Sequence, residues 1–317
     1  MPTLQFSLFS TSFTSFTFFT FFTSSTSSTS FTSFTSFPPM PLSLAYLGPA
    51  GTNSETVAIN YLQWLQQNTG QVAEMFAYSS ISQALKAVAT QEVARAIVPV
   101  ENSIEGSVAL TLDSLWQWDN LKIQQALVLP IVHALISKAT KLEELRVVYS
   151  HPQALGQCQG WLDQFLPQVQ RLPTNSTTDA LHYLEEDLTS GVISAPRAAQ
   201  IYGLPILAER INDYADNFTR FWVVGLTETT VGSHTSLAFS VPANVPGALM
   251  YPLQIFASRG INLSRIESRP TRRSFGDYLF FIDVEADLQS AALQSALEEL
   301  TPYTEMLKLF GSYTIMS

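Results

Sequence analysis

The sequence predicts an α/β domain followed by a smaller α+β domain. Between residues 42 and 225, short apolar runs typical of buried strands alternate with segments whose apolar residues recur at helical spacing. The last quarter of the chain instead reads strand, helix, strand, strand, helix, strand, which is the ferredoxin-like βαββαβ order. A length of 317 residues fits two domains, and a hydrophobic content of 46% is ample for packed cores.

Composition limits the possible partners. A net charge of −10 and the lack of any basic run in the sequence argue against a nucleic-acid surface. Since no apolar run reaches about 18 residues, we expect no membrane span. Cys158 is the single cysteine, so the chain cannot build a disulfide framework and a reducing, cytoplasmic compartment is expected. A small buried hydrophobic role suits Cys158 better than that of a nucleophile.

The first 37 residues consist almost entirely of Phe, Thr and Ser and carry no charge. They lack the basic residues of a signal or transit peptide, and their low complexity offers no periodic apolar face. We therefore expect residues 1–41 to be a disordered tail or a mis-assigned start, with Met40 as a natural beginning of the chain.

The α/β domain opens with a strand, a glycine-rich turn and a helix. The apolar run 44–47 leads into a turn with two glycines, and Thr52, Asn53 or Ser54 can cap the helix that follows. Unpaired amides at such a helix start can bind an anion, although the same turn also serves as a plain connection.

A second strand, 96–100, ends in Glu101, Asn102 and Ser103. Carboxylates and amides at the carboxyl end of a strand lie where ligands bind in open α/β sheets, whereas a surface turn with helix caps is the alternative.

A third strand, 147–150, ends at Ser150, which we expect to cap a helix with a proline in its first turn and Gln157 two turns along. His151 lacks metal-ligand spacing or an acidic neighbour, which favours a positioning or capping role over that of a base. Two more helices are expected to start after polar segments at 174–180 and 194–197. Several strand ends thus bring small polar residues together, which describes a cleft for a small anion.

The stretch from Asn217 to Phe221 runs into a strand that looks buried. The Thr219 hydroxyl lies between two aromatic residues, and it has chemical significance only where water is excluded and its partner is held in line. The adjacent Arg220 carries a planar guanidinium that matches a carboxylate. A strand threonine beside a surface arginine is the alternative.

Taken together, four motifs in this order are similar to those of the prephenate dehydratase family: 48–52, 98–103, 150–158 and 217–221. The resemblance extends from Leu42 to the C-terminus. It implies a catalytic domain over 42–225 with two α/β lobes, like a periplasmic binding protein, and an active site between them. Lobe 1 is expected at about 42–112 and 209–225, and lobe 2 at about 113–208.

The resemblance also implies a reaction. Prephenate loses water and carbon dioxide to give phenylpyruvate in phenylalanine biosynthesis, with no metal or organic cofactor. Thr219 is then the hydrogen-bond donor to the leaving hydroxyl, and Glu101 is the second candidate proton source, because a carboxyl in a closing cleft can have a raised pKa. The implied substrate-binding residues are Thr52, Asn102, Ser103, Ser150, Gln157, Arg220 and Phe221.

Residues 234–317 resemble the ACT regulatory domain. The expected elements are strand 235–241, a helix opening at 246, strands 261–268 and 278–285, helix 288–300 and strand 307–313. In the family, free L-phenylalanine binds this domain between subunits and regulates the active site, which implies a homodimer or homotetramer. The implied effector-binding residues are Gly247, Ala248, Leu249, Asn262, Leu263, Glu267, Ser268, Arg269 and Pro270. Read without the resemblance, Gly247 is a plain turn and Arg269 an exposed strand end.

Two other functions remain open from the sequence. An arogenate dehydratase would act on an amino acid in place of the oxo acid, and these motifs do not separate the two substrates. A non-catalytic amino-acid sensor would keep the lobes and the ACT domain, but Thr219, Glu101 and Gln157 favour an enzyme.

Overall fold

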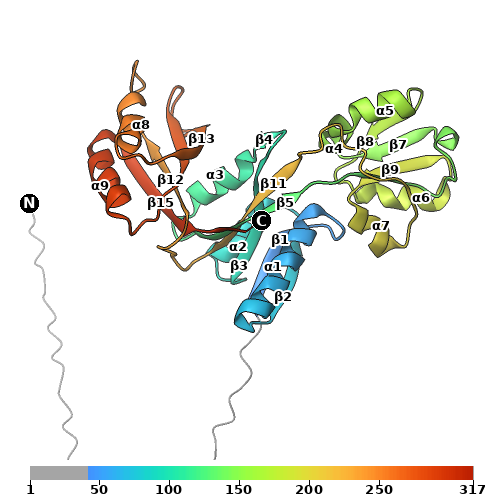
Figure 1. The fold of residues 1–317 in the computed structure, drawn as a ribbon, viewed down its shortest axis with the longest axis horizontal. Coiled ribbons are helices and arrows are strands. Elements are labelled where there is room, and N and C mark those ends of the chain that lie inside the picture. The colour runs from blue at the N-terminus through green and yellow to red at the C-terminus, as the bar shows by residue number, and fades with distance from the viewer. Residues whose placement is uncertain (1–41, 317) are drawn as a thin grey trace, which may run out of the picture. The chain divides into compact units, whose positions relative to one another are not determined.

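A computed structural model describes residues 42–316, which form three β-sheets (Figure 1). The expected N-terminal tail, residues 1–41, lies outside the described residues. No helix within 42–316 is long and apolar enough to cross a membrane.

The first sheet has the order β16-β5-β11-β3-β1-β2, with β4 paired to β3. Parallel pairing joins β1 to both β2 and β3, whereas β11 runs antiparallel to β3 and β5. Its strands are β1 (Leu42–Leu47), β2 (Ala73–Tyr78), β3 (Arg95–Asn102), β4 (Gly106–Ser107), β5 (Lys122–Pro130), β11 (Phe218–Gly225) and β16 (Ile315–Met316). Its helices are α1 (Asn53–Thr69), α2 (Ile81–Ala89) and α3 (Ala109–Gln117).

Alternate residues of β11 enter two different cores. Phe221 and Val223 pack with Tyr61 of α1, while Trp222 and Val224 belong to the cluster under α2 and α3. This follows from the period of two along a strand, since neighbouring side chains point to opposite faces of the sheet. The two faces of β11 therefore have different neighbours, and this determines which residues can reach the site.

The second sheet has the order β10-β6-β9-β7-β8. Its elements are β6 (Ala134–Ile136), β7 (Val147–Ser150), α4 (Pro152–Gln157), α5 (Gln159–Phe165), β8 (Gln170–Pro173), α6 (Tyr183–Glu186), β9 (Ser190–Ser194), α7 (Pro196–Tyr202) and β10 (Ile206–Ala208), with short 3-10 turns at Leu142–Glu144 and Asp179–His182.

The expected crossing into lobe 2 after Leu112 is too early. Strand β5 pairs with β11 from Lys122 to Pro130, so the chain stays in the first sheet up to Pro130. The expected return near Glu209 directly follows β10, the last strand of the second sheet, which ends at Ala208; Ile211 still packs in the core of the second lobe, and β11 begins at Phe218. The apolar residues of β5 therefore pack in the core of the first lobe, although the sequence predicted them to belong to the second lobe.

The C-terminal domain has the predicted βαββαβ order, and its antiparallel sheet runs β13-β14-β12-β15. Helices α8 and α9 cover one face through a core that includes Phe239, Phe256 and Leu293 (Figure 1). From the other face, Phe281 and Phe310 join the cluster under α2 and α3. The elements are β12 (His234–Ser240), α8 (Met250–Ala257), β13 (Leu263–Pro270), β14 (Tyr278–Val284), α9 (Ala291–Leu300), a 3-10 turn (Thr301–Tyr303) and β15 (Met306–Tyr313).

The chain ends in a strand that the sequence did not predict. After β15, strand β16 (Ile315–Met316) pairs in parallel with β5 of the first sheet. The amide of Ala126 donates to the carbonyl of Thr314 at 3.0 Å, which closes the junction. The C-terminal domain is therefore joined to the first sheet by main-chain hydrogen bonds as well as by side-chain packing.

Candidate active site

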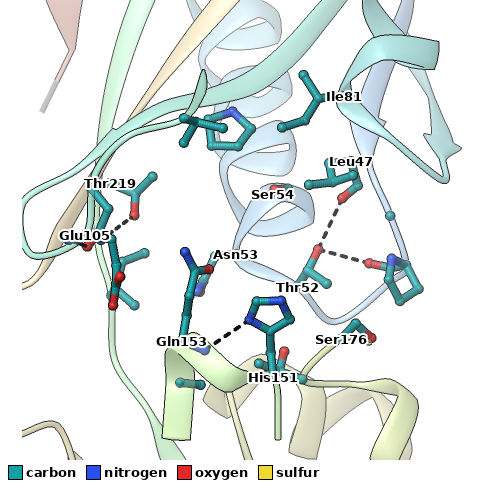
Figure 2. Close-up of a pocket in the computed structure, with 18 of the residues that line it drawn as sticks. Leu47, Thr52, Asn53, Ser54, Ile81, Glu105, His151, Gln153, Ser176 and Thr219 are labelled. Atoms are coloured by element: carbon teal, nitrogen blue, oxygen red, sulfur yellow. Dashed lines mark hydrogen bonds between the residues drawn. The ribbon is translucent and has the colours of Figure 1, made fainter. Parts of the chain in front are cut away.

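A pocket of about 780 Å³ lies between residues of the two lobes. The first lobe contributes the last residues of β1 and β3, the first residues of β11 and the start of α1, and the second lobe contributes α4 and the turn before α6. Figure 2 shows Thr219 and Glu105 together on one side of the pocket and Thr52 on the other. Five of the expected site residues line it: Thr52, Asn102, Gln157, Thr219 and Phe221.

Thr219 is 9% exposed, and its hydroxyl is oriented by Asn102. The Asn102 Nδ2 donates to Thr219 Oγ1 at 3.0 Å, while Asn102 Oδ1 accepts the amides of Ile104 and Glu105, both at 3.0 Å. These two amides fix which end of the Asn102 side chain faces Thr219. In the part of the chain that the structure describes, Thr219 Oγ1 accepts this bond and donates none, so its proton is free to point into the pocket.

A chain of amides continues from this pair across the cleft. Asn217 Oδ1 accepts from Asn102 Nδ2 at 2.8 Å, and Asn217 Nδ2 donates to Gln157 Oε1 at 2.8 Å. His133 Nε2 lies 2.9 Å from the same Gln157 oxygen, so this ring nitrogen must carry the proton. Gln157 Nε2 is thereby directed toward Glu105 Oε1, at 3.4 Å.

His133 is buried beside the pocket at 4% exposure. Burial lowers the pKa of the imidazole, and the hydrogen bond to Gln157 offsets part of this effect. The ring is therefore neutral near pH 7 and acts as a donor to Gln157. No motif in the sequence points to His133, which follows an apolar strand, and none points to Glu105.

A β-bulge decides which residues of β3 reach the pocket. Thr219 pairs with Asn102 and Arg220 with Glu101, but Phe221 pairs with Pro99, so Val100 is an extra residue on β3. Pro99 lines the pocket, and regular alternation from it would place Glu101 in the pocket as well. The extra residue reverses the alternation and presents Asn102 in its place.

The structure therefore corrects two expected assignments. Glu101 lies outside the pocket, with Oε2 at 3.7 Å from Arg220 Nη2. Arg220 also lies outside it, and its Nη1 is 3.4 Å from Asp283 Oδ2 in the C-terminal domain. Both side chains project from the face of the sheet opposite Thr219, so neither is placed to contact a ligand in the pocket.

Two expected serine contacts are structural instead. Ser150 is fully buried and donates to the carbonyl of Ile193 at 2.6 Å, and Ser103 Oγ accepts the amide of Phe218 at 2.9 Å. Neither lines the pocket. The expected cap of α4 is also displaced by one residue, because His151 Nδ1 accepts the amide of Gln153 at 3.3 Å. The predicted capping role of His151 is confirmed.

The two lobes contact each other beside the start of α1. Thr52, one of the three residues predicted as possible caps, is the N-cap of this 17-residue helix and accepts the amide of Glu55 at 3.3 Å. Glu55 Oε2 accepts from the Gly51 amide and from Arg197 Nε on α7, both at 2.9 Å. Gly51 has a φ of +84°, and a Cβ there would lie 3.3 Å from Ala198, so only glycine permits this approach.

The charges in the pocket lining are two carboxylates, Glu105 and Asp179, among many neutral donors. An anionic ligand must therefore be held by amide and hydroxyl groups and by the free amides at the start of α1. Among residues 42–316, no group of three His, Cys, Asp or Glu side chains is placed to hold a metal ion.

Family models match both parts of the chain. The family model "Prephenate dehydratase" matches residues 44–229, and the ACT domain model matches residues 235–301. The chain belongs to the prephenate dehydratase family. The predicted enzyme class, a carbon–oxygen lyase with an ACT regulatory domain, is confirmed, as is the combination of a two-lobed catalytic fold and a ferredoxin-like domain.

Relatives cover nearly the whole described chain. A bifunctional chorismate mutase/prephenate dehydratase of Aquifex aeolicus is 39% identical over 274 residues, covering 86% of this chain and 73% of the relative. The prephenate dehydratase of Lactococcus lactis subsp. cremoris is 35% identical over 284 residues, covering 87% and 99%. The solved structure of the Arthrobacter aurescens prephenate dehydratase in complex with L-Phe is 34% identical, with a TM-score of 0.75 and coverage of 86% and 90%.

Proposed function

We propose that Thr219 donates the hydrogen bond to the departing hydroxyl of prephenate. The orientation of Asn102 supports this assignment most directly, because Asn102 occupies Thr219 Oγ1 as a donor and leaves the hydroxyl proton for the ligand. Phe221, two residues along β11, lines the same pocket and offers an apolar surface to the ring that becomes aromatic.

The chemistry needs one proton and no electron acceptor. As the ring carboxylate leaves as carbon dioxide, its bonding electron pair moves into the ring and expels the hydroxyl, which takes up a proton and departs as water. A donor fixed at the leaving oxygen stabilises the negative charge that develops there. The carboxyl that faces Thr219 in the pocket is Glu105, and we propose it in place of Glu101 as the proton source.

The substrate carboxylates are held by neutral donors in this proposal. Gln157 Nε2 points into the cleft with its other end fixed by Asn217 and His133. Thr52 and the first amides of α1 face the pocket from the opposite side. Ser103 and Ser150 support this arrangement from outside the pocket.

We further propose that L-phenylalanine regulates the enzyme through the ACT domain of a homodimer or homotetramer, in the cytoplasm. The complex of the Arthrobacter relative with L-Phe supports the effector, and the free, buried Cys158 is consistent with a reducing compartment. Gly247 has a φ of +84° just before α8, which suits close approach of a ligand to the backbone. The proposed effector residues are Gly247, Ala248, Leu249, Asn262, Leu263, Glu267, Ser268, Arg269 and Pro270.

Arg269 has a partner within the chain. It makes a two-point ion pair with Asp113 on α3, at 3.0 and 3.1 Å, so the predicted exposed strand end is instead a contact with the catalytic domain. A role of Arg269 toward the effector would require this pair to be shared or broken.

The decisive experiment measures turnover of prephenate and of arogenate, side by side, by the protein beginning at Met40 and by its Thr219→Ala variant. We expect phenylpyruvate from prephenate and a loss of at least about tenfold to a hundredfold in the variant. Near-normal turnover in the variant would remove Thr219 from the mechanism. A strong preference for arogenate would keep the mechanism and change the substrate, and calorimetry with L-phenylalanine tests the effector separately.

A further inference from the structure

A buried ion cluster lies directly behind Thr219, on the face of β11 that looks away from the pocket. Its centre is Asp283 of β14, which is fully buried in the ACT domain. Asp283 Oδ2 accepts from Arg265 Nε at 2.8 Å, and Asp283 Oδ1 lies 3.3 Å from Arg265 Nη2. Arg220, the residue after Thr219, places Nη1 3.4 Å from the same Oδ2.

The cluster contains equal numbers of positive and negative side chains, and a serine hydroxyl also donates to its central carboxylate. Arg220 and Arg265 face Asp283 and Glu101, two cations against two anions. Ser236 donates to Asp283 Oδ1 at 2.5 Å. Burial alone would lower the pKa of Arg265, but the Asp283 carboxylate outweighs it, and the pKa is raised. The guanidinium of Arg265 therefore stays charged, and a buried charge is costly to separate from its partner.

Contacts along β11 reinforce this arrangement. The guanidinium of Arg265 lies over the ring of Trp222, with 5.1 Å from Cζ to the centroid. Trp222 shares the Arg220 face of β11 and is 1% exposed. Two successive side chains on that face of β11 are thus held by residues of the ACT sheet, one by charge and one by stacking.

The ion cluster and the active site are adjacent at the β-bulge between β3 and β11. Arg220 is paired with Glu101 where the register shifts, and the next pair along is Thr219 with Asn102. A movement of Arg220 therefore moves the backbone that carries Thr219, at a place where one extra residue already interrupts the ladder.

We infer that Asp283 is a positioning residue for the dehydratase reaction: it anchors Arg220 from behind the sheet and so determines where the Thr219 hydroxyl stands in the pocket. The inference rests on the proposed role of Thr219. It also gives the ACT domain a route to the reacting group, because Arg265 lies on β13, the strand that carries the proposed effector residues Glu267 to Pro270. A ligand that shifts β13 would act on Arg265, Asp283, Arg220 and Thr219 in turn.

The test uses Arg220→Met and Asp283→Asn in the full chain, with kcat expressed per folded molecule. Since a misplacement of about 1 Å at a reacting group can cost about a hundredfold, we expect each variant to lose about tenfold or more in kcat with little change in KM. Arg220→Met is the milder change, because Asp283 keeps Arg265. Arg220→Met is the deciding variant if Asp283→Asn does not fold because the buried Arg265 and the partly buried Arg220 have lost their shared counter-charge.

A thermodynamic cycle separates positioning from simple stability. In a Thr219→Ala background, Arg220→Met should cause no further loss of kcat, because the group it positions is already gone. The matched control is Lys308→Met, which removes another contact between the ACT and catalytic domains, a lysine bound to the carbonyls of Leu115, Trp116 and Trp118. This control should lower the melting temperature and leave kcat unchanged.

Two results would overturn the inference. One is unchanged kcat per folded molecule in Arg220→Met, and the other is an equal loss in the wild-type and Thr219→Ala backgrounds. If Thr219→Ala itself keeps full activity, the proposed function fails and not only this inference. As a second readout, phenylalanine should still bind Arg220→Met in calorimetry but should change its activity less than it changes that of the wild type. An undiminished response would refute the proposed route.

Discussion

Replacing Asn102 by aspartate changes a hydrogen-bond donor beside Thr219 into an acceptor, and so tests the orientation of the Thr219 hydroxyl. In the wild type, Asn102 Nδ2 donates to Thr219 Oγ1, Asn217 Oδ1 and the carbonyl of Phe218, at 3.0, 2.8 and 3.1 Å. The Asn102→Asp change puts an oxygen in place of this donor. The Thr219 hydroxyl must then turn and donate its proton to the new carboxylate instead of the substrate.

The size of the effect follows from the strength of that new bond. A hydrogen bond to a charged group is worth about 1.5–3 kcal/mol. This free energy must be recovered to turn the hydroxyl back to the substrate, so kcat should fall about tenfold to a hundredfold at about 1.4 kcal/mol per tenfold. Asn217 Oδ1 also loses its donor, which should lower the free energy of unfolding by about 1–3 kcal/mol, whereas the carbonyl of Phe218 still accepts the amide of Ser103.

Steady-state kinetics on prephenate, with Asn102→Ala as the matched control, checks this reasoning. The alanine variant removes the donor without offering a competing acceptor, so its loss of kcat should be smaller. Because protonation of the new carboxyl restores a donor, the aspartate variant should recover part of its activity as the pH is lowered, and the alanine variant should not. Equal kcat values in the two variants at every pH would refute the proposed orientation of Thr219.

Three further changes test other parts of the structure. Burial lowers the pKa of His133 in the folded protein. The neutral His133 ring therefore contributes its full stability above the unfolded-state pKa of about 6.5. This stability is lost as the pH falls through the lower folded-state pKa, by at most about 1.4 kcal/mol per pH unit. His133→Gln should flatten this slope in urea unfolding between about pH 7.5 and about pH 5.5, and an unchanged slope would contradict it. Arg197→Gln removes the inter-lobe ion pair with Glu55. Because this pair is partly exposed, we expect KM to rise only about two- to fivefold, with kcat nearly unchanged. An unaltered KM would show that the pair does not help close the cleft. Deleting residues 314–317 removes β16 from the edge of β5 and should cost about 2 kcal/mol, a few degrees in the thermal midpoint by calorimetry, whereas an unchanged midpoint would assign no stability to that strand.

Local chemistry in the sequence predicted much of the fold. Three possible capping residues, Thr52 to Ser54, before an amphipathic segment predicted the start of α1, and the apolar runs at 44–47, 96–100 and 147–150 predicted three strands. The last quarter followed its expected order because each element carries its own periodicity and boundary residues. Such signals are local, so they can be recognised without knowing which elements pack against each other.

The misplaced residues depend on contacts far apart in the sequence. Glu101 leaves the pocket because Val100 is bulged against β11, more than a hundred residues away. Strand β5 belongs to the first lobe because of the same partner strand, which no local pattern indicates. Arg220 and Arg269 looked free for an anion, but their counter-charges, Asp283 and Asp113, come from another domain. Strand register and contacts between domains depend on tertiary packing, and the secondary-structure propensities of single residues do not predict them.

The most direct test of the central claim compares Thr219→Ser with Thr219→Val on prephenate, in the protein beginning at Met40. Serine keeps the hydroxyl, while valine keeps the branched shape without it. If the hydroxyl proton assists the departure of water, kcat should stay within about tenfold in the serine variant and fall about a hundredfold or more in the valine variant. Comparable kcat values for valine and wild type, with both variants folded by circular dichroism, would contradict the assignment of Thr219 as the donor.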